Sequence, residues 1–184
     1  PNQKGITMGQ NRALGSGFVG LVGLAGLAAL TSPLAAQDSG PWRLAPTSDL
    51  SAMLDCFEAA GKTLISAHRG GPMPGLPENA IPTMDALLAA QPAIMEVDVG
   101  KSTDGVHFLL HDDRLDRTTT GTGEAAANDW ATLNALRLKD NWGWVTPYAI
   151  PKLTEALAWA KGRTVLQIDF KRSADYDAVV AAIR

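Results

Sequence analysis

The sequence has almost no cysteine and no excess of basic charge. Cys56 is the single cysteine among 184 residues, so no disulfide can form within the chain. A lone cysteine can be a nucleophile or bridge two chains, but free cysteine is most often a small buried residue, and we expect this of Cys56 on a helix. With 16 Lys and Arg against 19 Asp and Glu, the chain lacks the positive charge typical of nucleic-acid binding, so we expect no nucleic-acid partner.

Long runs of like charge are also absent, and so is the composition of a disordered chain. Hydrophobic residues make up 46% of the sequence and charged residues 19%, which argues against disorder. The length suits one ordinary globular domain.

The N-terminal region has the pattern of a signal peptide. Arg12 precedes an uncharged apolar run, Phe18 to Leu30, and small residues follow up to Ala36, where a signal peptidase could cut. The run has 13 residues, whereas a membrane span needs roughly 20. We therefore expect a periplasmic or secreted protein with no stable membrane span after cleavage; an uncleaved anchor is the alternative. The chain then divides into residues 1–7 upstream, a signal peptide at 8–36, a linker at 37–48 and a partial barrel domain at 49–184.

Helix and strand patterns alternate over the domain. Apolar residues at helical spacing and short β-type runs predict these elements. The expected helices are 49–60, 79–91, 129–136, 151–161 and 174–183, and the expected strands are 63–67, 93–99, 106–110 and 164–170. Asn79 could cap the second helix, and Pro151 would lie in the first turn of the fourth. Alternating strands and helices imply a mostly parallel sheet, either doubly wound or the start of a (β/α)₈ barrel.

Ionisable residues stand at the end of each expected strand. They are His68 and Arg69, then Glu96 and Asp98, then His111, then Asp169 and Lys171. Alternate residues of a strand share a face, so Glu96 and Asp98 point to the same side, and so do Asp169 and Lys171. Parallel strands end at one rim, where barrel active sites lie, so we expect these side chains to converge there.

This combination of residue types indicates metal-assisted phosphoryl chemistry. Burying so many charges apart would be costly, whereas around a cation they neutralise one another. Three carboxylates without a thiolate favour Mg²⁺ or Ca²⁺. Two strand-end histidines suit general acid–base catalysis near neutral pH, and the two cations suit a phosphate. His107, early in its strand, is expected to be structural.

A series of short motifs runs from about Leu64 to Lys171. In order they are His68-Arg69-Gly70, Pro77-Glu78-Asn79, Glu96-x-Asp98, Thr103-Asp104-Gly105, His111-Asp112, Leu115-Asp116-Arg117-Thr118-Thr119-x-Gly121-x-Gly123 and Ile150-Pro151-x-Leu153-x-Glu155. As an ordered series they resemble the glycerophosphodiester phosphodiesterases.

The resemblance implies a TIM-type barrel enzyme that hydrolyses small glycerophosphodiesters to glycerol 3-phosphate and an alcohol. It implies metal ligands at Glu96, Asp98 and Asp169, an acid–base pair at His68 and His111, and phosphate contacts at Arg69 and Lys171. In the family, the glycerol 2-hydroxyl attacks phosphorus while one histidine takes its proton and the other protonates the leaving alcohol. Asp169 stands where the family usually has Glu, one methylene longer.

A complete barrel needs about 250 residues. We therefore expect an α/β fold that is the N-terminal half of a TIM-type barrel, truncated after strand four, and inactive by itself. Trp142 and Trp144 lie in an atypical segment, which we expect to be a packed loop rather than a lid over a hydrophobic alcohol.

Two other functions remain open from the sequence. The first is a phospholipase of the sphingomyelinase D or phosphoinositide-cleaving type on a similar barrel. The second is a catalytically inactive binding or structural module.

Overall fold

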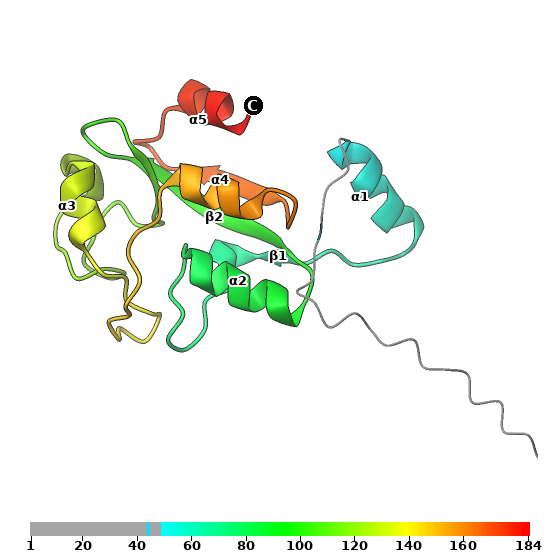
Figure 1. The fold of residues 1–184 in the computed structure, drawn as a ribbon, viewed down its shortest axis with the longest axis horizontal. Coiled ribbons are helices and arrows are strands. Elements are labelled where there is room, and N and C mark those ends of the chain that lie inside the picture. The colour runs from blue at the N-terminus through cyan, green and yellow to red at the C-terminus, as the bar shows by residue number, and fades with distance from the viewer. Residues whose placement is uncertain (1–43, 45–48) are drawn as a thin grey trace, which may run out of the picture. The chain divides into compact units, whose positions relative to one another are not determined.

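The computed structural model describes Leu44 and residues 49–184. The predictions for residues 1–7, for the signal peptide at 8–36 and for the linker at 37–48, Leu44 apart, lie outside the described residues. The elements are α1 (Leu50–Ala59), β1 (Ser66–Ala67), η1 (His68–Gly70), α2 (Ile81–Ala90), β2 (Ile94–Lys101), β3 (His107–Leu109), η2 (Ala125–Ala127), α3 (Trp130–Ala135), α4 (Leu153–Ala160), β4 (Leu166–Phe170) and α5 (Tyr176–Ile183) (Figure 1). None of the described helices combines the length and the apolar character that crossing a membrane requires.

Strand β2 is the centre of the sheet. It pairs in parallel with β1 and β4, and antiparallel with β3. Met95 pairs with both Ala67 and Leu166, so β1 and β4 lie on opposite edges of β2. Val99 likewise pairs with residues of both β3 and β4, so β3 shares an edge with β1, further along β2.

The direction of β3 corrects the expectation that this strand is a parallel strand of the barrel. A tight turn joins β2 to β3: Ser102 N donates to Val106 O at 3.0 Å, and Gly105 adopts φ 85°. A parallel partner would need a crossover of a dozen or more residues, and the turn is far shorter than that. The described part is therefore an α/β fold with three parallel strands and one antiparallel hairpin strand.

One face of β2 holds the main hydrophobic core. Met95, Val97 and Val99 are fully buried, and they pack with residues of α2, α4 and α5. Figure 1 shows α2 and α4 on the same side of β2. Because alternate residues face opposite sides of a strand, Glu96 and Asp98 point away from these helices.

A second hydrophobic cluster supports the segment after β3. Its buried residues are Ala80, Phe108, Leu110, Leu115, Ala125, Leu133, Leu138 and Ile150. The long excursion between β3 and α4, which includes α3, is thus anchored by a core of its own.

Several local expectations need correction. The N-cap of α2 is Ala80, with no side-chain cap bond, so Asn79 is not a helix cap. Helix α4 begins at Leu153 after its N-cap Lys152, so Pro151 precedes the helix. Cys56 is exposed, as is most of α1, which has no buried residue. The expected burial of Cys56 is therefore wrong.

Gly70 offers a test of how tightly the chain packs just after β1. Gly70 and Gly75 have φ of 77° and 76°, but a Cβ on Gly70 would lie 2.7 Å from Met84 Cγ, whereas a Cβ on Gly75 meets nothing within 4 Å. Both alanine variants bear a left-handed backbone cost of about 1–2 kcal/mol. Gly70→Ala should lose a further ~1–3 kcal/mol from overpacking against a buried side chain. Urea unfolding of the two variants measures the difference, and equal losses would contradict the packing at Gly70.

Candidate active site

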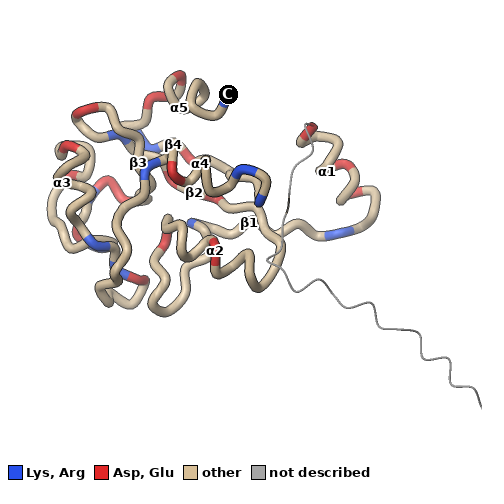
Figure 2. The backbone as a smooth tube through the Cα atoms, in the orientation of Figure 1, with Lys and Arg blue, Asp and Glu red and all other residues tan. Residues whose placement is uncertain are grey.

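Three carboxylates meet on the face of the sheet opposite the main core. One oxygen each of Glu96, Asp98 and Asp169 lies within 4.8 Å of the other two. Asp98 and Asp169 are direct partners in the β2–β4 register, which brings them side by side at the carboxyl ends of two parallel strands. Figure 2 shows acidic residues along these two strands. Although Asp169 has a short side chain, it reaches this group.

Lys171 places its ammonium group on two of these carboxylates. Its Nζ lies 2.7 Å from Asp98 Oδ1 and 2.9 Å from Asp169 Oδ2. Burial lowers the pKa of Lys171, but the hydrogen bonds and charges of the two aspartates outweigh it, and the pKa is raised overall. The Lys171 hydrogen bond also lowers the pKa of Asp169, so both groups are held in their charged forms.

The donor set fits a hard divalent cation. One ammonium neutralises only one of the three carboxylates, which leaves excess negative charge at Glu96, Asp98 and Asp169. Oxygen ligands without sulfur or nitrogen are typical of Mg²⁺ and Ca²⁺ sites.

Asn79 holds the most deeply buried of the three carboxylates. Its Nδ2 donates to Asp98 Oδ2 at 2.8 Å, and its Oδ1 accepts from the Asp98 backbone N at 2.9 Å. Both residues are almost inaccessible, and Asn79 has φ 56°, a conformation that asparagine tolerates better than most residues. The side chain that we expected to cap α2 therefore orients Asp98.

Glu78 connects two arginines beneath the site. It is 2% exposed and accepts from Arg69 Nη1 at 3.2 Å and from Arg117 Nη2 at 2.8 Å. Burial raises the pKa of Glu78, yet the hydrogen bond and charge of Arg117, with the charge of Arg69, lower it overall. The backbone N of Arg69 donates to Glu96 Oε2 at 2.6 Å, which ties this network to the carboxylates.

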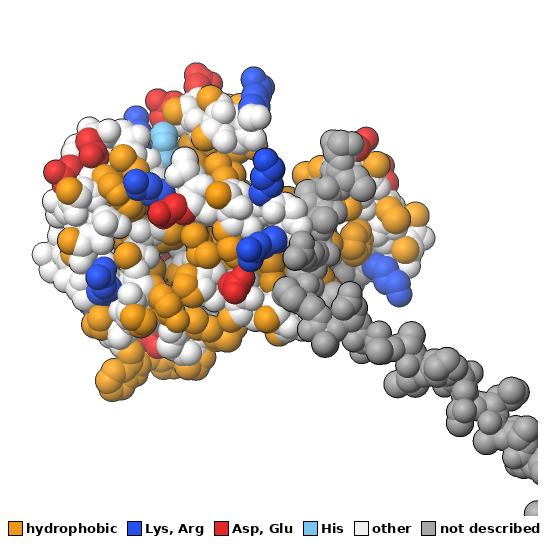
Figure 3. Space-filling model, in the orientation of Figure 1, with side chains coloured by type: hydrophobic (Ala, Val, Ile, Leu, Met, Phe, Trp, Pro, Cys, Tyr) orange, Lys and Arg blue, Asp and Glu red, His pale blue; other side chains and the backbone are white. Residues whose placement is uncertain are grey.

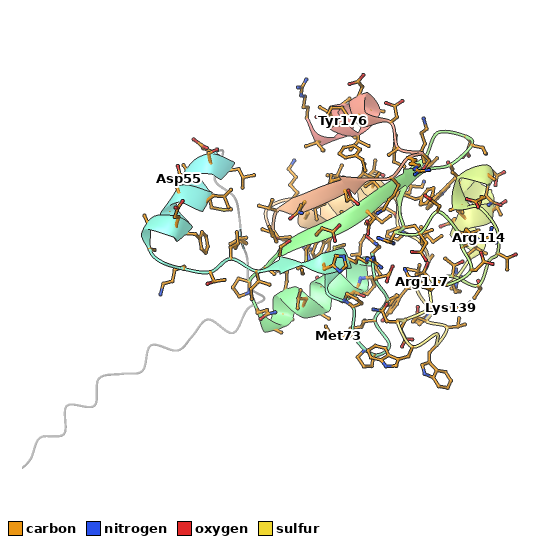
Figure 4. The ribbon with its side chains drawn as sticks, turned by 180° about the vertical axis from the view of Figure 1, so that it is seen from behind. Asp55, Met73, Arg114, Arg117, Lys139 and Tyr176 are labelled. Atoms are coloured by element: carbon orange, nitrogen blue, oxygen red, sulfur yellow. The ribbon has the colours of Figure 1, made fainter. Side chains whose placement is uncertain are left out.

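Arg117 is a site residue that we did not select from the sequence, although it lies in the quoted motif. It bonds Asp112 through Nε and Nη2, both at 2.7 Å, as well as Glu78. These bonds, opposed by burial and assisted by His111, lower the pKa of Asp112 to about 2. Arg117 and Arg114, three residues apart in the sequence, lie on the same side of the molecule in Figure 4.

His111 is oriented by its neighbour in the chain. Its Nδ1 lies 2.8 Å from Asp112 Oδ1. A carboxylate that is ionised above about pH 2 can only accept, so Nδ1 carries the proton and Nε2 is left for other chemistry. His111 and Lys171 line one open hollow of about 510 Å³.

The other two histidines differ from each other. His68 follows β1 directly and is exposed, and among the described residues its ring makes no hydrogen bond to another predicted site residue. His107 Nε2 accepts from the backbone N of Asp175, the N-cap of α5, at 3.2 Å, which fits a structural role.

The tryptophan loop is not packed as expected. Trp142 is 60% exposed and Trp144 is 74% exposed. The two tryptophans are therefore not packed, whereas Leu138, Asp140 and Thr146 of the same segment are buried.

Comparison with known proteins gives one consistent family. A model of the "Glycerophosphoryl diester phosphodiesterase family" matches residues 68–182. The crystal structure of a glycerophosphoryl diester phosphodiesterase from Parabacteroides distasonis is similar with a TM-score of 0.63 and 42% identity, over 65% of this chain and 42% of that chain.

Two further relatives agree. An Oleispira antarctica phosphodiesterase, solved in complex with the product sn-glycerol-3-phosphate, is similar with a TM-score of 0.50 and 29% identity, over 61% of this chain and 46% of that chain. The glycerophosphodiester phosphodiesterase of Caldanaerobacter subterraneus subsp. tengcongensis is 39% identical over 34% of this chain and 25% of its own length. This chain spans less than half the length of each of these three relatives.

Replacing Arg117 tests the network around Asp112. In Arg117→Gln we expect the pKa of Asp112 to rise from about 2 towards its ordinary value of 3.8, because its strongest hydrogen-bond donor loses its charge. A carboxyl pKa that is depressed in the folded state adds stability above the ordinary pKa, and this stability disappears as the pH falls through the folded value. The wild-type advantage in unfolding free energy should therefore be present above about pH 4 and shrink towards about pH 2.

NMR titration of the Asp112 carboxyl carbon and urea unfolding at several pH values measure both effects. Arg114→Gln is the matched control, because Arg114 pairs with Asp116 and Glu124 instead. A wild-type Asp112 that titrates at its ordinary value would contradict this geometry.

Proposed function

Because the chain belongs to the glycerophosphoryl diester phosphodiesterase family, we propose that the whole protein hydrolyses glycerophosphodiesters to glycerol 3-phosphate and an alcohol, with a divalent cation. The family predicted from the motifs is thereby confirmed, and the likeness to solved relatives implies the expected TIM-type barrel.

The observation that most supports this proposal is the meeting of Glu96, Asp98 and Asp169. These three carboxylates would hold Mg²⁺ or Ca²⁺ at the rim where parallel strands end. When bound, the cation supplies positive charge for the oxygens of a phosphodiester. Lys171 already lies at this rim, and its ammonium would bind the same phosphate.

Arg69 has a donor left for a ligand. Two of its hydrogen bonds go from Nη1 to Glu78, but its Nε is buried and has no partner among the described residues. A buried N–H without an acceptor is costly, and a phosphate oxygen would satisfy it. This supports the assignment of Arg69, with Lys171, to phosphate binding.

His111 suits proton transfer at the reacting oxygens. Asp112 fixes the proton on Nδ1 and would stabilise the imidazolium that forms when Nε2 takes a proton, as a carboxylate does in other acid–base pairs. We assign His68 as the second member of the pair. One histidine would take the proton of the glycerol 2-hydroxyl and the other would protonate the leaving alcohol.

The substrate is then a small glycerophosphodiester, and the comparisons favour this over the phospholipase alternative. Export to the periplasm or outside the cell remains our prediction from residues 8–36 of the sequence. The inactive module also remains an alternative, which turnover measurements decide.

Histidine variants test the acid–base assignment. In the full-length protein, His68→Ala and His111→Ala should each lower kcat by about 100-fold or more, since a positioned acid or base contributes roughly 10²–10⁴-fold. Release of glycerol 3-phosphate from glycerophosphocholine measures turnover. His107→Gln is the control, because Gln keeps an acceptor for the Asp175 N–H and should leave kcat nearly unchanged. A His68 or His111 variant that keeps more than a tenth of the wild-type kcat would contradict the acid–base role of that histidine.

Carboxylate variants test the metal site. Glu96→Gln and Asp169→Asn should each weaken Mg²⁺ or Ca²⁺ binding by about tenfold or more, because each removes a charged oxygen ligand. Asp169→Glu, which restores the usual residue of the family, should retain binding. Calorimetric titration of each metal into the protein measures the affinity. Glu58→Gln on α1 is the control for loss of a negative charge, and unchanged affinity in Glu96→Gln would remove Glu96 from the site.

A further inference from the structure

Residues 139–146 form a hairpin that holds Trp142 and Trp144 exposed to solvent. Lys139 and Val145 pair across it, and Asp140 N donates to Trp144 O at 2.9 Å. Gly143, with φ 86°, makes the turn. We call residues 139–146 the tryptophan hairpin.

A single buried carboxylate holds the hairpin in shape. Asp140 is 5% exposed, and its Oδ1 accepts from the backbone N of Trp142 at 3.0 Å and of Trp144 at 2.9 Å. Its Oδ2 accepts from Gly75 N at 2.9 Å. These three backbone N–H groups satisfy both oxygens of Asp140. They hold the hairpin in the shape that exposes the two indole rings.

The bond to Gly75 joins the hairpin to the loop of the active site. Residues 71–76 connect His68–Gly70 to Glu78 and Asn79, and they form a turn in which Met73 and Leu76 pair through their backbones. Met73 and Lys139 lie towards the same end of the molecule in Figure 4. The hairpin and residues 71–76 are therefore in direct contact, and we call the two segments together the hairpin rim.

The exposed surface of this rim is apolar. Trp142, Trp144 and Val145 are 60%, 74% and 58% exposed, and Pro74 on the neighbouring loop is also exposed. Figure 3 shows hydrophobic side chains gathered at the lower edge of the molecule. Several large apolar side chains exposed in one short segment are a candidate interaction site.

The charges next to the hairpin are positive. Neither Arg137 nor Lys139 forms an ion pair with any carboxylate of the described part of the chain; their side chains donate to the carbonyls of Leu136 and Asp116. The only acidic side chain of the hairpin, Asp140, is buried and bonded to N–H groups. An apolar tip flanked by uncompensated cations complements an anionic lipid surface.

We propose that the tryptophan hairpin docks the protein on a phospholipid surface that contains anionic lipid. Indole rings favour the boundary between headgroups and acyl chains, where the ring is dehydrated and its N–H stays hydrated. The cations meet the lipid phosphates at the same depth. Docking would hold the rim of the active site at the membrane, where phospholipid-derived diesters arise.

Vesicle binding tests this proposal without any turnover, so it can fail while the proposed hydrolase activity holds. The full chain is sedimented with phosphatidylcholine vesicles that contain about one-fifth phosphatidylglycerol. Trp142→Ala combined with Trp144→Ala should weaken partitioning by about tenfold or more, because two large apolar side chains no longer enter the interface. Residues 18–30 are identical in all variants and contribute equally, so the difference reports the hairpin.

The control and a second readout make the result specific. Tyr176→Ala removes an aromatic side chain that is 64% exposed on α5 and should leave partitioning unchanged. Brominated lipid should quench tryptophan fluorescence in the wild type more than in Trp142→Phe combined with Trp144→Phe. Pure phosphatidylcholine should bind the wild type more weakly than the anionic vesicles.

Two outcomes would overturn the proposal. Equal partitioning of the wild type and the double alanine variant would leave the hairpin without a lipid role. If vesicle binding is equal but the double variant raises KM for a diester with a bulky apolar alcohol, the hairpin belongs to the substrate pocket instead.

Discussion

The arrangement of the site depends on hydrogen-bond partners for both oxygens of one buried carboxylate. Asp98 is 1% exposed, and an ionised carboxylate in such a place is tolerated only if its oxygens are bonded. Asn79 and Lys171 supply those bonds from two different segments, one after β1 and one after β4. Three stretches that are distant in the sequence are thereby held at one level of the sheet. The left-handed backbone at Asn79 is tolerated because the amide makes two hydrogen bonds to the same residue.

The strand geometry of the site could be predicted from the sequence. In β2 the buried apolar residues and the acids alternate, and a period of two is enough to place Glu96 and Asp98 on the face opposite the helices. The position of Asp169 beside Asp98 follows once β4 pairs in parallel with β2, since their carboxyl ends then coincide. These inferences needed only local periodicity and the direction of neighbouring strands.

The contacts that the sequence did not reveal are those made by long or buried polar side chains. Asn79 before an apolar helix is the usual sign of a cap, and only the tertiary structure shows its amide bonded to Asp98. Arg117 lies between Glu78 and Asp112, which are 39 and 5 residues away along the chain. The burial of Asp140 depends on Gly75, 65 residues away, so the exposure of the tryptophans could not be inferred from their own neighbourhood.

His111 lines the same hollow as Lys171, although the direction we expected for its strand was wrong. We expected it at the end of a parallel strand, whereas β3 leaves the end of β2 through a tight turn and runs back along it. The backbone N of Leu110 donates to Asp98 O at 3.0 Å, so the chain has returned to the level of Asp98 just before His111. A parallel strand that ended at the rim would deliver its last residue to that same level. The position of Leu110 opposite Asp98 therefore determines where His111 lies, whichever direction the strand runs.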